Sequence, residues 1–255
     1  MLGNKLAVVT GASEGIGFGI AEAFIHNDAE VIIIARSELK LNAAKSKLGQ
    51  NGGVINILKG DLTMPSEVMR LGKEIREQWP AIDILVNNAG IADFKPFPNC
   101  NERDLDQHID LNFKAPFLLS QILLPSLKRQ QGNIINISSY FASRMLAGRP
   151  SSIYSSTKGA IESWTKALAF ELGSMKIRVN SIAPGTIDTP MMQRNLASLS
   201  DIDRSNFLKN IQSLYPLGKV GGIEDVAQTA VFLASDKAKW ITGANIAVDG
   251  GLTTH

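Results

Sequence analysis

The chain has little of what several specialised protein classes require. Its 255 residues include one cysteine, Cys100, so no disulfide can form within the chain and a disulfide-stabilised secreted fold is excluded. Lysine and arginine together number 26 and aspartate and glutamate 24, which leaves a net charge of only +2. A chain with this balance is expected to be neither a basic nucleic-acid-binding protein nor a disordered one.

Long hydrophobic runs and metal-ligand patterns are also missing. Apolar runs such as residues 31–35 are far shorter than the roughly 20 residues that a membrane-spanning helix needs, so no membrane contact is expected. The histidines His26, His108 and His255 stand far apart and show no ligand spacing with Cys100, so we predict no metal site. The expectation that remains is a globular protein of the reducing cytoplasm.

The sequence does contain an alternation of short β-branched runs and longer helical segments. The expected strands cover residues 6–10, 31–35, 54–58, 82–86, 133–137, 178–183 and 244–248, and the expected helices 15–26, 39–48, 102–129, 154–172 and 223–234, with another after Pro65. This alternation indicates a parallel sheet covered on both faces. The predicted fold is therefore α/β, a single doubly wound Rossmann-type domain over residues 1–255 with a seven-stranded parallel sheet. We predict that residues 186–220, the one long irregular segment, form a mobile substrate lid.

A glycine-rich turn follows the first expected strand. It reads Thr10-Gly11-Ala12-Ser13-Glu14-Gly15-Ile16-Gly17 and opens the first expected helix. Glycine allows a tight turn and a close approach of the backbone to a ligand, and the helix start offers free amides to a pyrophosphate. The alternative is that the glycines serve only the packing of helix on strand.

Further motifs follow in order along the chain. Asn87-Asn88-Ala89-Gly90 follows the fourth strand, Tyr154 and Lys158 form a Tyr-x-x-x-Lys pair, Pro184-Gly185 follows the sixth strand, and Asp249-Gly250-Gly251 follows the last. Together with the glycine-rich turn, these motifs resemble those of the short-chain dehydrogenase/reductase family, in particular its 3-oxoacyl-[acyl-carrier-protein] reductase-like members. The resemblance implies a nicotinamide cofactor and hydride transfer between that cofactor and a carbonyl or secondary alcohol substrate.

The same resemblance implies a set of cofactor-binding residues at the carboxyl edge of the sheet. They are Gly11, Ser13, Gly15, Ile16, Gly17, Arg36, Asp61, Leu62, Asn88, Ala89, Gly90, Tyr154, Lys158, Pro184, Gly185, Ile187 and Thr189. Asn87 is expected to brace the sheet. Asp61 can instead cap a turn or the helix that starts near Pro65, and Thr63 is equally suited to cap that helix. Thr189 has the sequence of a helix cap.

The end of the second strand bears on the choice of cofactor. Rossmann proteins that prefer NAD usually place an acidic residue there to bind the ribose hydroxyl, whereas this strand ends with Ala35 and Arg36. A guanidinium can bind the 2′-phosphate of NADP and stack on adenine, so we predict NADP(H), with NAD(H) less favoured. The alternative is that Arg36 is a solvated residue that binds no ligand. Glu14 argues mildly against NADP, because some NADP-using relatives carry a basic residue at that place.

The predicted catalytic residues are Asn112, Ser139, Tyr154 and Lys158. Tyr154 and Lys158 are four residues apart and share one face of a helix, where a nearby ammonium favours the phenolate. The pair can therefore act as general acid and base. The resemblance adds Ser139 as a donor to the substrate oxygen, with Ser138 structural, and Asn112 as part of a proton relay through a water.

The expected walls of the substrate pocket are residues 91–97, residues 140–149, and the region of Met191 and Met192. Their apolar side chains favour an apolar or amphiphilic carbonyl compound. A 3-oxoacyl thioester is one candidate, and a steroid, a sugar and a small ketone are others. Arg144 and Arg149 can recognise an anionic group or can be solvated loop residues.

Dehydratase or epimerase relatives are one alternative, but they generally carry a longer substrate domain at the C-terminus. Two further competing functions use the same fold. One is a nucleotide-sensing binding protein without turnover, which typically lacks members of the catalytic set. The other is an NAD-preferring alcohol dehydrogenase. By family resemblance a homo-oligomer, with a tetramer favoured, is expected, and its contacts are expected on helices 102–129 and 154–172.

Overall fold

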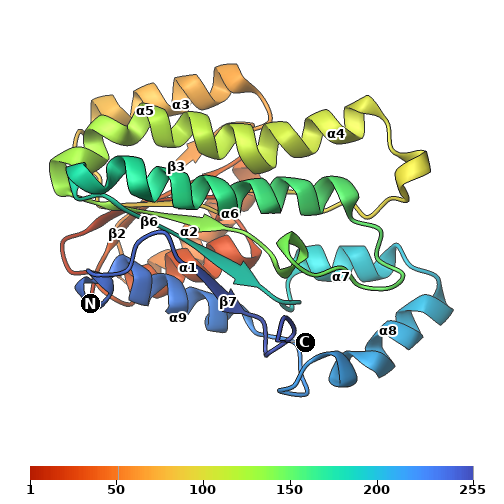
Figure 1. The fold of residues 1–255 in the computed structure, drawn as a ribbon. Helices are drawn as coiled ribbons and strands as arrows, with labels where there is room; N and C mark the ends of the chain where they lie inside the picture. The colour runs from red at the N-terminus through yellow and green to blue at the C-terminus, as the bar shows by residue number, and fades with distance from the viewer. Residues whose placement is uncertain (51, 255) are drawn as a thin grey trace.

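The computed structural model describes residues 1–50 and 52–254 and is built on one seven-stranded parallel sheet (Figure 1). The strands are β1 (Leu6–Thr10), β2 (Glu30–Ala35), β3 (Ile55–Lys59), β4 (Ile84–Asn87), β5 (Asn133–Ile137), β6 (Arg178–Pro184) and β7 (Asn245–Val248). Their order is β3-β2-β1-β4-β5-β6-β7, and each neighbouring pair is parallel. The order reverses between β1 and β4, and sheets of this kind bind ligands at the carboxyl ends of the strands beside such a reversal. The predicted fold class is confirmed.

Helices cover both faces of the sheet (Figure 1). One face is packed by α1 (Gly15–Ile25), α2 (Glu38–Gly49) and α9 (Ile223–Ala234), and the other by α3 (Pro65–Gln78), α5 (Ala115–Gln130) and α6 (Ser152–Leu172). Alternate residues of a strand serve the two layers: Ala7 and Val9 of β1 join one hydrophobic cluster and Val8 joins the other. Strands buried on both faces explain the continuous apolar runs in the sequence.

The segment predicted as one helix over residues 102–129 is interrupted. It consists of α4 (Glu102–Ile109), five residues of π-helix (Asp110–Lys114) and α5. Asn112 lies in the π-helical turn and is buried. Such turns are rare and occur frequently at functional sites. The other predicted bounds agree with the structure to within two residues.

The prediction that residues 186–220 are irregular is wrong. Two helices, α7 (Pro190–Ala197) and α8 (Asp201–Leu214), occupy most of the segment and extend from one end of the sheet (Figure 1). Each begins at a side-chain cap, because Thr189 accepts from the Met192 amide at 3.2 Å and Ser200 from the Asp203 amide at 3.1 Å. Most of their side chains are exposed or half-buried, so the segment lacks the apolar period that reveals a core helix.

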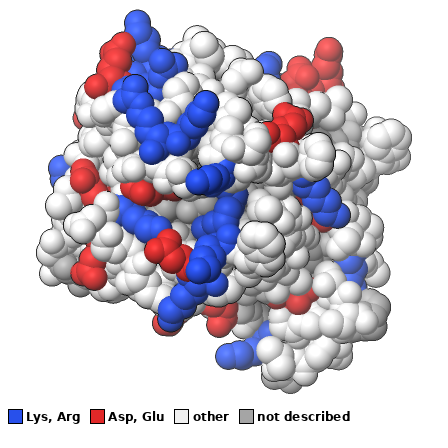
Figure 2. Space-filling model, turned by 60° about the vertical axis from the view of Figure 1, so that its left-hand side comes forward, with Lys and Arg blue, Asp and Glu red and all other residues white. Residues whose placement is uncertain are grey.

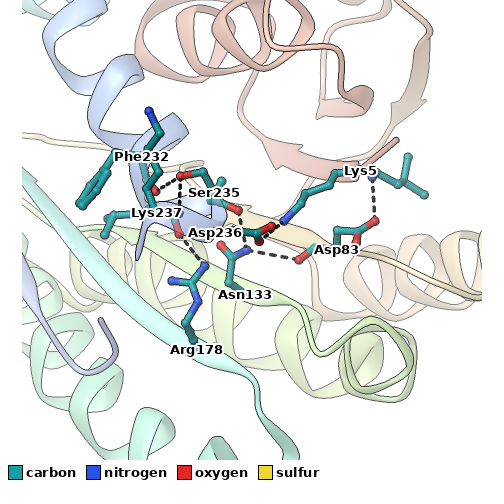
Figure 3. Close-up of polar contacts among 11 residues, drawn as sticks. Lys5, Asp83, Asn133, Arg178, Phe232, Ser235, Asp236 and Lys237 are labelled. Atoms are coloured by element: carbon teal, nitrogen blue, oxygen red, sulfur yellow. Dashed lines mark hydrogen bonds and ion pairs between the residues drawn. The ribbon is translucent and has the colours of Figure 1, made fainter. Parts of the chain in front are cut away.

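A polar network closes the opposite, amino edge of the sheet (Figure 3). Asp83 accepts a hydrogen bond from the first amide of β1 at 2.9 Å, and Lys5 pairs with Asp236 at 3.1 Å. Arg178 donates to the carbonyl of Leu233 at 2.7 Å, where a cation stabilises the C-terminal end of α9. Asp83, Lys5, Asp236 and Arg178 are thus engaged at this edge, whereas the buried Oδ1 of Asn133 has no hydrogen-bond partner among the described residues.

The surface carries charges of both signs. Figure 2 shows basic side chains in several groups, with acidic side chains among them, around a hollow. No helix within residues 1–50 and 52–254 is both long and apolar enough to cross a membrane.

Candidate active site

A cavity of about 470 Å³ opens at the carboxyl edge of the sheet. The loops that follow β1 to β6 form its wall together with α6 and α7. Its volume is in the range of small-molecule pockets. The predicted residues that line it are Gly11, Ser13, Gly15, Ile16, Arg36, Asp61, Leu62, Asn88, Ala89, Gly90, Ser139, Tyr154, Lys158, Pro184, Gly185, Ile187 and Thr189. Two others, Gly17 and Asn112, do not line it and contact residues of its wall from behind.

The turn after β1 is packed too tightly for side chains at two of its glycines. Gly11 has φ of +66°, and a Cβ built on it would lie 2.9 Å from Cα of Ala89. A Cβ on Gly17 would lie 2.4 Å from Nδ2 of Asn88, which itself donates to the Thr10 carbonyl at 2.9 Å. Gly11 and Gly17 therefore let the loops after β1 and β4 lock together at the cavity wall.

The first turn of α1 is open toward this cavity. Its N-cap residue, Glu14, makes no side-chain capping hydrogen bond, and Gly15 and Ile16 line the cavity. The free amides at a helix N-terminus and the helix dipole together favour an anion. The residues present therefore fit the pyrophosphate of a dinucleotide.

The carboxylate of Glu14 pairs with two cations. It lies 2.7 Å from Lys40 Nζ, on α2, and 3.0 Å from the Arg194 guanidinium, on α7. The hydrogen bond from Lys40, followed by the contact with Arg194, lowers the pKa of Glu14 despite its partial burial. The pair with Arg194 ties the helix α7 to the turn after β1. Nothing in the sequence signals this contact, because it joins residues far apart in the chain.

Arg36 lies where the cavity meets a second hollow of about 580 Å³. The other basic residues of this hollow are already paired: Lys59 lies 3.1 Å from Glu38, and Arg70 lies 2.9 Å from Glu67. Within the described part of the chain, Arg36 makes no ion pair or side-chain hydrogen bond. Its guanidinium is therefore available to an anionic ligand at this end of the cavity.

Asp61 closes a local turn instead of capping a helix. Its Oδ1 accepts from the amide of Thr63 at 3.0 Å and from the hydroxyl of Thr63 at 2.8 Å. The N-cap of α3 is Met64, without a side-chain cap, so neither Asp61 nor Thr63 caps that helix, whereas the turn cap considered for Asp61 is observed. Asp61 remains part of the cavity wall.

Asn87 braces the sheet as predicted. Its Nδ2 donates to Asn136 of β5 at 2.8 Å and to Ser120 of α5 at 3.1 Å. Next to it, Asn88 faces the cavity and fixes the turn after β1. Asn87 therefore braces the sheet and Asn88 lines the cavity, which is the division that the family pattern implies.

Ser139, Tyr154 and Lys158 meet at the cavity wall. Tyr154 and Lys158 come from successive turns of α6, and the Lys158 Nζ lies 5.7 Å from the centre of the Tyr154 ring. Ser139, which follows β5, lies close enough to the Tyr154 hydroxyl to lower its pKa. Lys158 also donates to the Ile137 carbonyl at 2.7 Å, which fixes the ammonium against β5.

Asn112 supports this group from behind. Its Oδ1 accepts from the Ile91 amide at 2.9 Å, and its Nδ2 donates to the Ile91 carbonyl at 3.0 Å and to Thr157 at 3.1 Å. The side chain therefore joins the π-helical turn to the loop after β4 and to α6. Ser138 turns away from Tyr154 and donates to Glu162 at 2.9 Å, which is the structural role predicted for it.

Comparisons with known proteins agree with this geometry. A family profile described as enoyl-(acyl carrier protein) reductase matches residues 11–253. The 3-oxoacyl-[acyl-carrier-protein] reductase FabG of Chlamydia muridarum is 37% identical over 254 residues, which are 99% of this chain and 98% of that protein. The chain belongs to the short-chain dehydrogenase/reductase family. The predicted family resemblance is confirmed, and the chain is an oxidoreductase of a family that uses NAD(P)(H).

Solved structures of this short-chain dehydrogenase/reductase family superpose over the whole chain. A short-chain type dehydrogenase/reductase from Mycobacterium marinum is 29% identical, with a TM-score of 0.91 and coverage of 100% of this chain and 97% of that one. A Beutenbergia cavernae protein, assigned provisionally as an NAD(P) dependent gluconate 5-dehydrogenase and holding NADP at low occupancy, gives the same identity and TM-score, with coverage of 100% and 98%.

Burial dominates the protonation of the pair on α6 in this short-chain dehydrogenase/reductase. It raises the pKa of Tyr154, and the nearby Ser139 side chain offsets only part of that rise. Burial also lowers the pKa of Lys158 from 10.5 to about 8. Burial and Ser139 are the causes of the Tyr154 shift, so the expectation that the nearby ammonium favours its phenolate stays a prediction.

One further site residue was not anticipated. Tyr215, buried at the end of α8, accepts a hydrogen bond from the Thr186 amide at 2.9 Å and donates to the Thr186 hydroxyl at 2.6 Å. It thereby fixes the start of the segment that carries α7 and α8. A single tyrosine in a segment predicted to be irregular gives no sequence signal of such a role.

Within residues 1–50 and 52–254, no cluster of three or more metal-ligating side chains is found. His108 is buried, and its ring nitrogens lie 2.8 Å from the Asp104 carbonyl and 3.3 Å from the Asp93 amide. It joins α4 to the loop after β4. His255 lies outside the described residues.

Proposed function

We propose that this protein transfers a hydride between NADP(H) and a carbonyl or secondary alcohol substrate. The observation that carries the proposal is that Ser139, Tyr154 and Lys158 meet at the wall of a cavity that also receives the open N-terminus of α1. A bound nicotinamide supplies or accepts the hydride. The protein then has to bind the substrate oxygen and move one proton.

The chain's own groups divide that work. Tyr154, kept protonated by burial, donates its proton to the substrate oxygen in reduction and takes it back in oxidation. Ser139 donates a hydrogen bond as negative charge develops on that oxygen. Lys158, with a pKa of about 8, can give or accept a proton beside the tyrosine. Asn112 holds the loop after β4 against α6 through its hydrogen bonds to Ile91 and Thr157.

Replacement of Tyr154 by phenylalanine tests this assignment. A panel of carbonyl compounds with NADPH identifies a substrate for the wild-type protein. Tyr154→Phe should then abolish turnover while NADPH binding, followed by nucleotide fluorescence, changes less than about threefold, because the phenol acts on the substrate oxygen. Retained turnover in the variant contradicts the role, and a wild-type protein that binds NADPH without turnover favours the nucleotide-sensing alternative.

The preference for NADP(H) rests on Arg36. Its guanidinium makes no ion pair among the described residues and stands at the end of β2, where an acidic residue would favour NAD. The solved Beutenbergia cavernae neighbour with bound NADP supports the choice. The ratio of kcat/KM for NADPH and NADH tests it, and a clear preference for NADH would support the alternative of an NAD-preferring alcohol dehydrogenase.

We also propose that residues 1–255 form one domain holding both sites, with 186–220 as the substrate lid. A homo-oligomer, with a tetramer favoured, is supported by adjoining rings on α5 and α6: Phe117 lies 6.0 Å from Trp164 and is 40% exposed. The single cysteine supports a cytoplasmic location. The substrate is proposed to be a small molecule, with neither nucleic acid nor membrane as a partner.

A further inference from the structure

Arg149 occupies an unusual place in the loop between β5 and α6. Its guanidinium carbon lies 5.3 Å from the centre of the Phe94 ring and 4.6 Å from the centre of the Phe207 ring. Phe94 follows β4 and Phe207 belongs to α8, so the guanidinium sits between the body of the protein and the lid. Arg149 is half-buried and lines the same cavity as Tyr154.

The hydrogen-bonding capacity of this guanidinium is unused. An arginine has five N–H donors along the edge of its plane, whereas aromatic rings engage the face. Within the described part of the chain, the Arg149 side chain makes no ion pair and no hydrogen bond. Arg144, the other arginine of this loop, is different because its guanidinium donates to the carbonyl of Leu252.

The charge of Arg149 affects the pKa of two tyrosines in the site. Burial raises the pKa of Tyr140 and of Tyr215, and the positive charge of Arg149 acts against that rise at both hydroxyls. Asp93 also lines the cavity but forms no ion pair with Arg149. The charge therefore lies near buried phenols, and no carboxylate of the described residues forms an ion pair with it, although Asp249 acts on Tyr215 in the opposite direction.

Phe94 links this charge to the catalytic group. Its ring lies 6.0 Å from the Tyr154 ring, in an edge-on arrangement, and it is also the ring beneath the Arg149 guanidinium. One aromatic side chain thus separates the free guanidinium from the proposed proton donor. Arg149 and Tyr154 both line the same cavity.

We infer that Arg149 binds an anionic group of the substrate, a carboxylate or a phosphate, while the carbonyl of the same molecule lies at Tyr154. The substrate class is therefore a small carbonyl compound that carries an anion, and Arg149 determines that specificity. This inference rests on the proposed oxidoreductase function for its carbonyl half. Its anion-binding half can be measured without turnover.

The binding test uses simple probes and the protein saturated with NADP+. Hexanoate, hexyl phosphate and hexan-1-ol are titrated by calorimetry into the wild-type protein and into Arg149→Gln, with Arg144→Gln as the matched control in the same loop. We expect at least one anion to bind the wild type about tenfold or more tightly than the alcohol, and Arg149→Gln to lose that advantage, because charge-assisted hydrogen bonds are among the strong ones. Comparison of hexanoate with hexyl phosphate shows whether the site prefers a carboxylate or a phosphate.

The kinetic test compares 5-oxohexanoate with its methyl ester, which keeps the ketone and loses the charge. Arg149→Gln should raise KM for the acid about tenfold or more and change kcat/KM for the ester less than about threefold, whereas Arg149→Lys should recover part of the loss. Unchanged thermal unfolding of the variants separates anion recognition from a role in holding the lid.

Three outcomes overturn the inference. The first is that neither anion binds the wild type better than hexan-1-ol does. The second is that Arg149→Gln binds the anions as tightly as the wild type does. The third is that Arg144→Gln loses as much anion binding as Arg149→Gln does. A wild-type protein that binds hexanoate through Arg149 but reduces no carbonyl compound refutes the proposed function and leaves the anion site standing. The two failures are therefore distinguishable.

Discussion

Replacing Lys158 by methionine should stabilise the protein at neutral pH although it removes a proposed catalytic residue. The pKa of Lys158 is lowered by burial from 10.5 to about 8, so holding this ammonium in the folded state costs about 3 kcal/mol at pH 7. Methionine fills similar space without charge but leaves the Ile137 carbonyl without the donor that lies 2.7 Å away, at a cost of about 1–3 kcal/mol. The net gain of up to about 2 kcal/mol corresponds to a rise in Tm of up to about 6 °C.

The sign of this effect should change with pH. Below pH 8 the lysine is charged in both the folded and the unfolded chain, so the burial cost is fully present. Between pH 8 and 10.5 the folded lysine loses its proton while the unfolded one keeps it, so the wild-type protein gains stability as the pH rises. Above that range only the lost hydrogen bond remains, and the methionine variant should be the less stable protein.

Scanning calorimetry of the wild type and Lys158→Met at pH 7 and pH 10 measures the difference in Tm between them. Lys166→Met is the control, since Lys166 is an exposed lysine on the same helix and its replacement should give no pH-dependent difference. The reasoning is refuted if Lys158→Met is destabilised at pH 7, or if its difference from the wild type is the same at both pH values.

Three further substitutions test the cofactor end of the cavity. Arg36→Ala should lower kcat/KM for NADPH about 10- to 100-fold and change that for NADH less than about threefold, and equal losses for both would contradict phosphate recognition. Glu14→Gln removes a carboxylate from the cavity wall and should strengthen NADPH binding about 2- to 10-fold in calorimetry at low salt, with a smaller gain at high salt; weaker binding would show that its ion pairs matter more. Gly17→Ala should cost at least about 1–3 kcal/mol in urea unfolding, since its Cβ would lie 2.4 Å from Asn88, whereas Gly49→Ala, with nothing within 4 Å, should cost nothing.

The sheet was predictable because its strands are buried on both faces. Residues 31–34 of β2 and 84–86 of β4 are buried and apolar, so each strand is recognised as a short apolar run. The lid was not predictable by the same rule, since α8 presents mostly exposed or half-buried side chains. Its start could have been predicted from the sequence, because Ser200 followed three residues later by Asp203 is a capping pattern.

The site was predictable where it depends on residues close in sequence. Tyr154 and Lys158 share a helix face by their spacing, and the family motifs supply the loops that the sheet gathers at one edge. Contacts that depend on where the lid rests were not predictable, such as the pair of Glu14 with Arg194. The rise in the pKa of Tyr154 was not predictable for a related reason: the depth of burial is a property of the whole fold, and no local spacing shows it.

The wall of the cavity formed by the sheet and α6 is more rigidly packed than the wall formed by the lid. This difference determines where substrate specificity can change. Ser139, Lys158 and Asn112 are each less than 10% exposed and are fixed by the sheet and by hydrogen bonds to the backbone. The lid is tied to that body by contacts such as the half-exposed pair of Glu14 with Arg194, and pairs of this kind contribute about 0–1 kcal/mol. Substitutions on α7 and α8 can therefore alter what the cavity accepts while the core and the catalytic geometry stay intact. The residues proposed to move the proton lie where substitution is costly, and the residues of α7 and α8 proposed to cover the substrate lie where it is cheap.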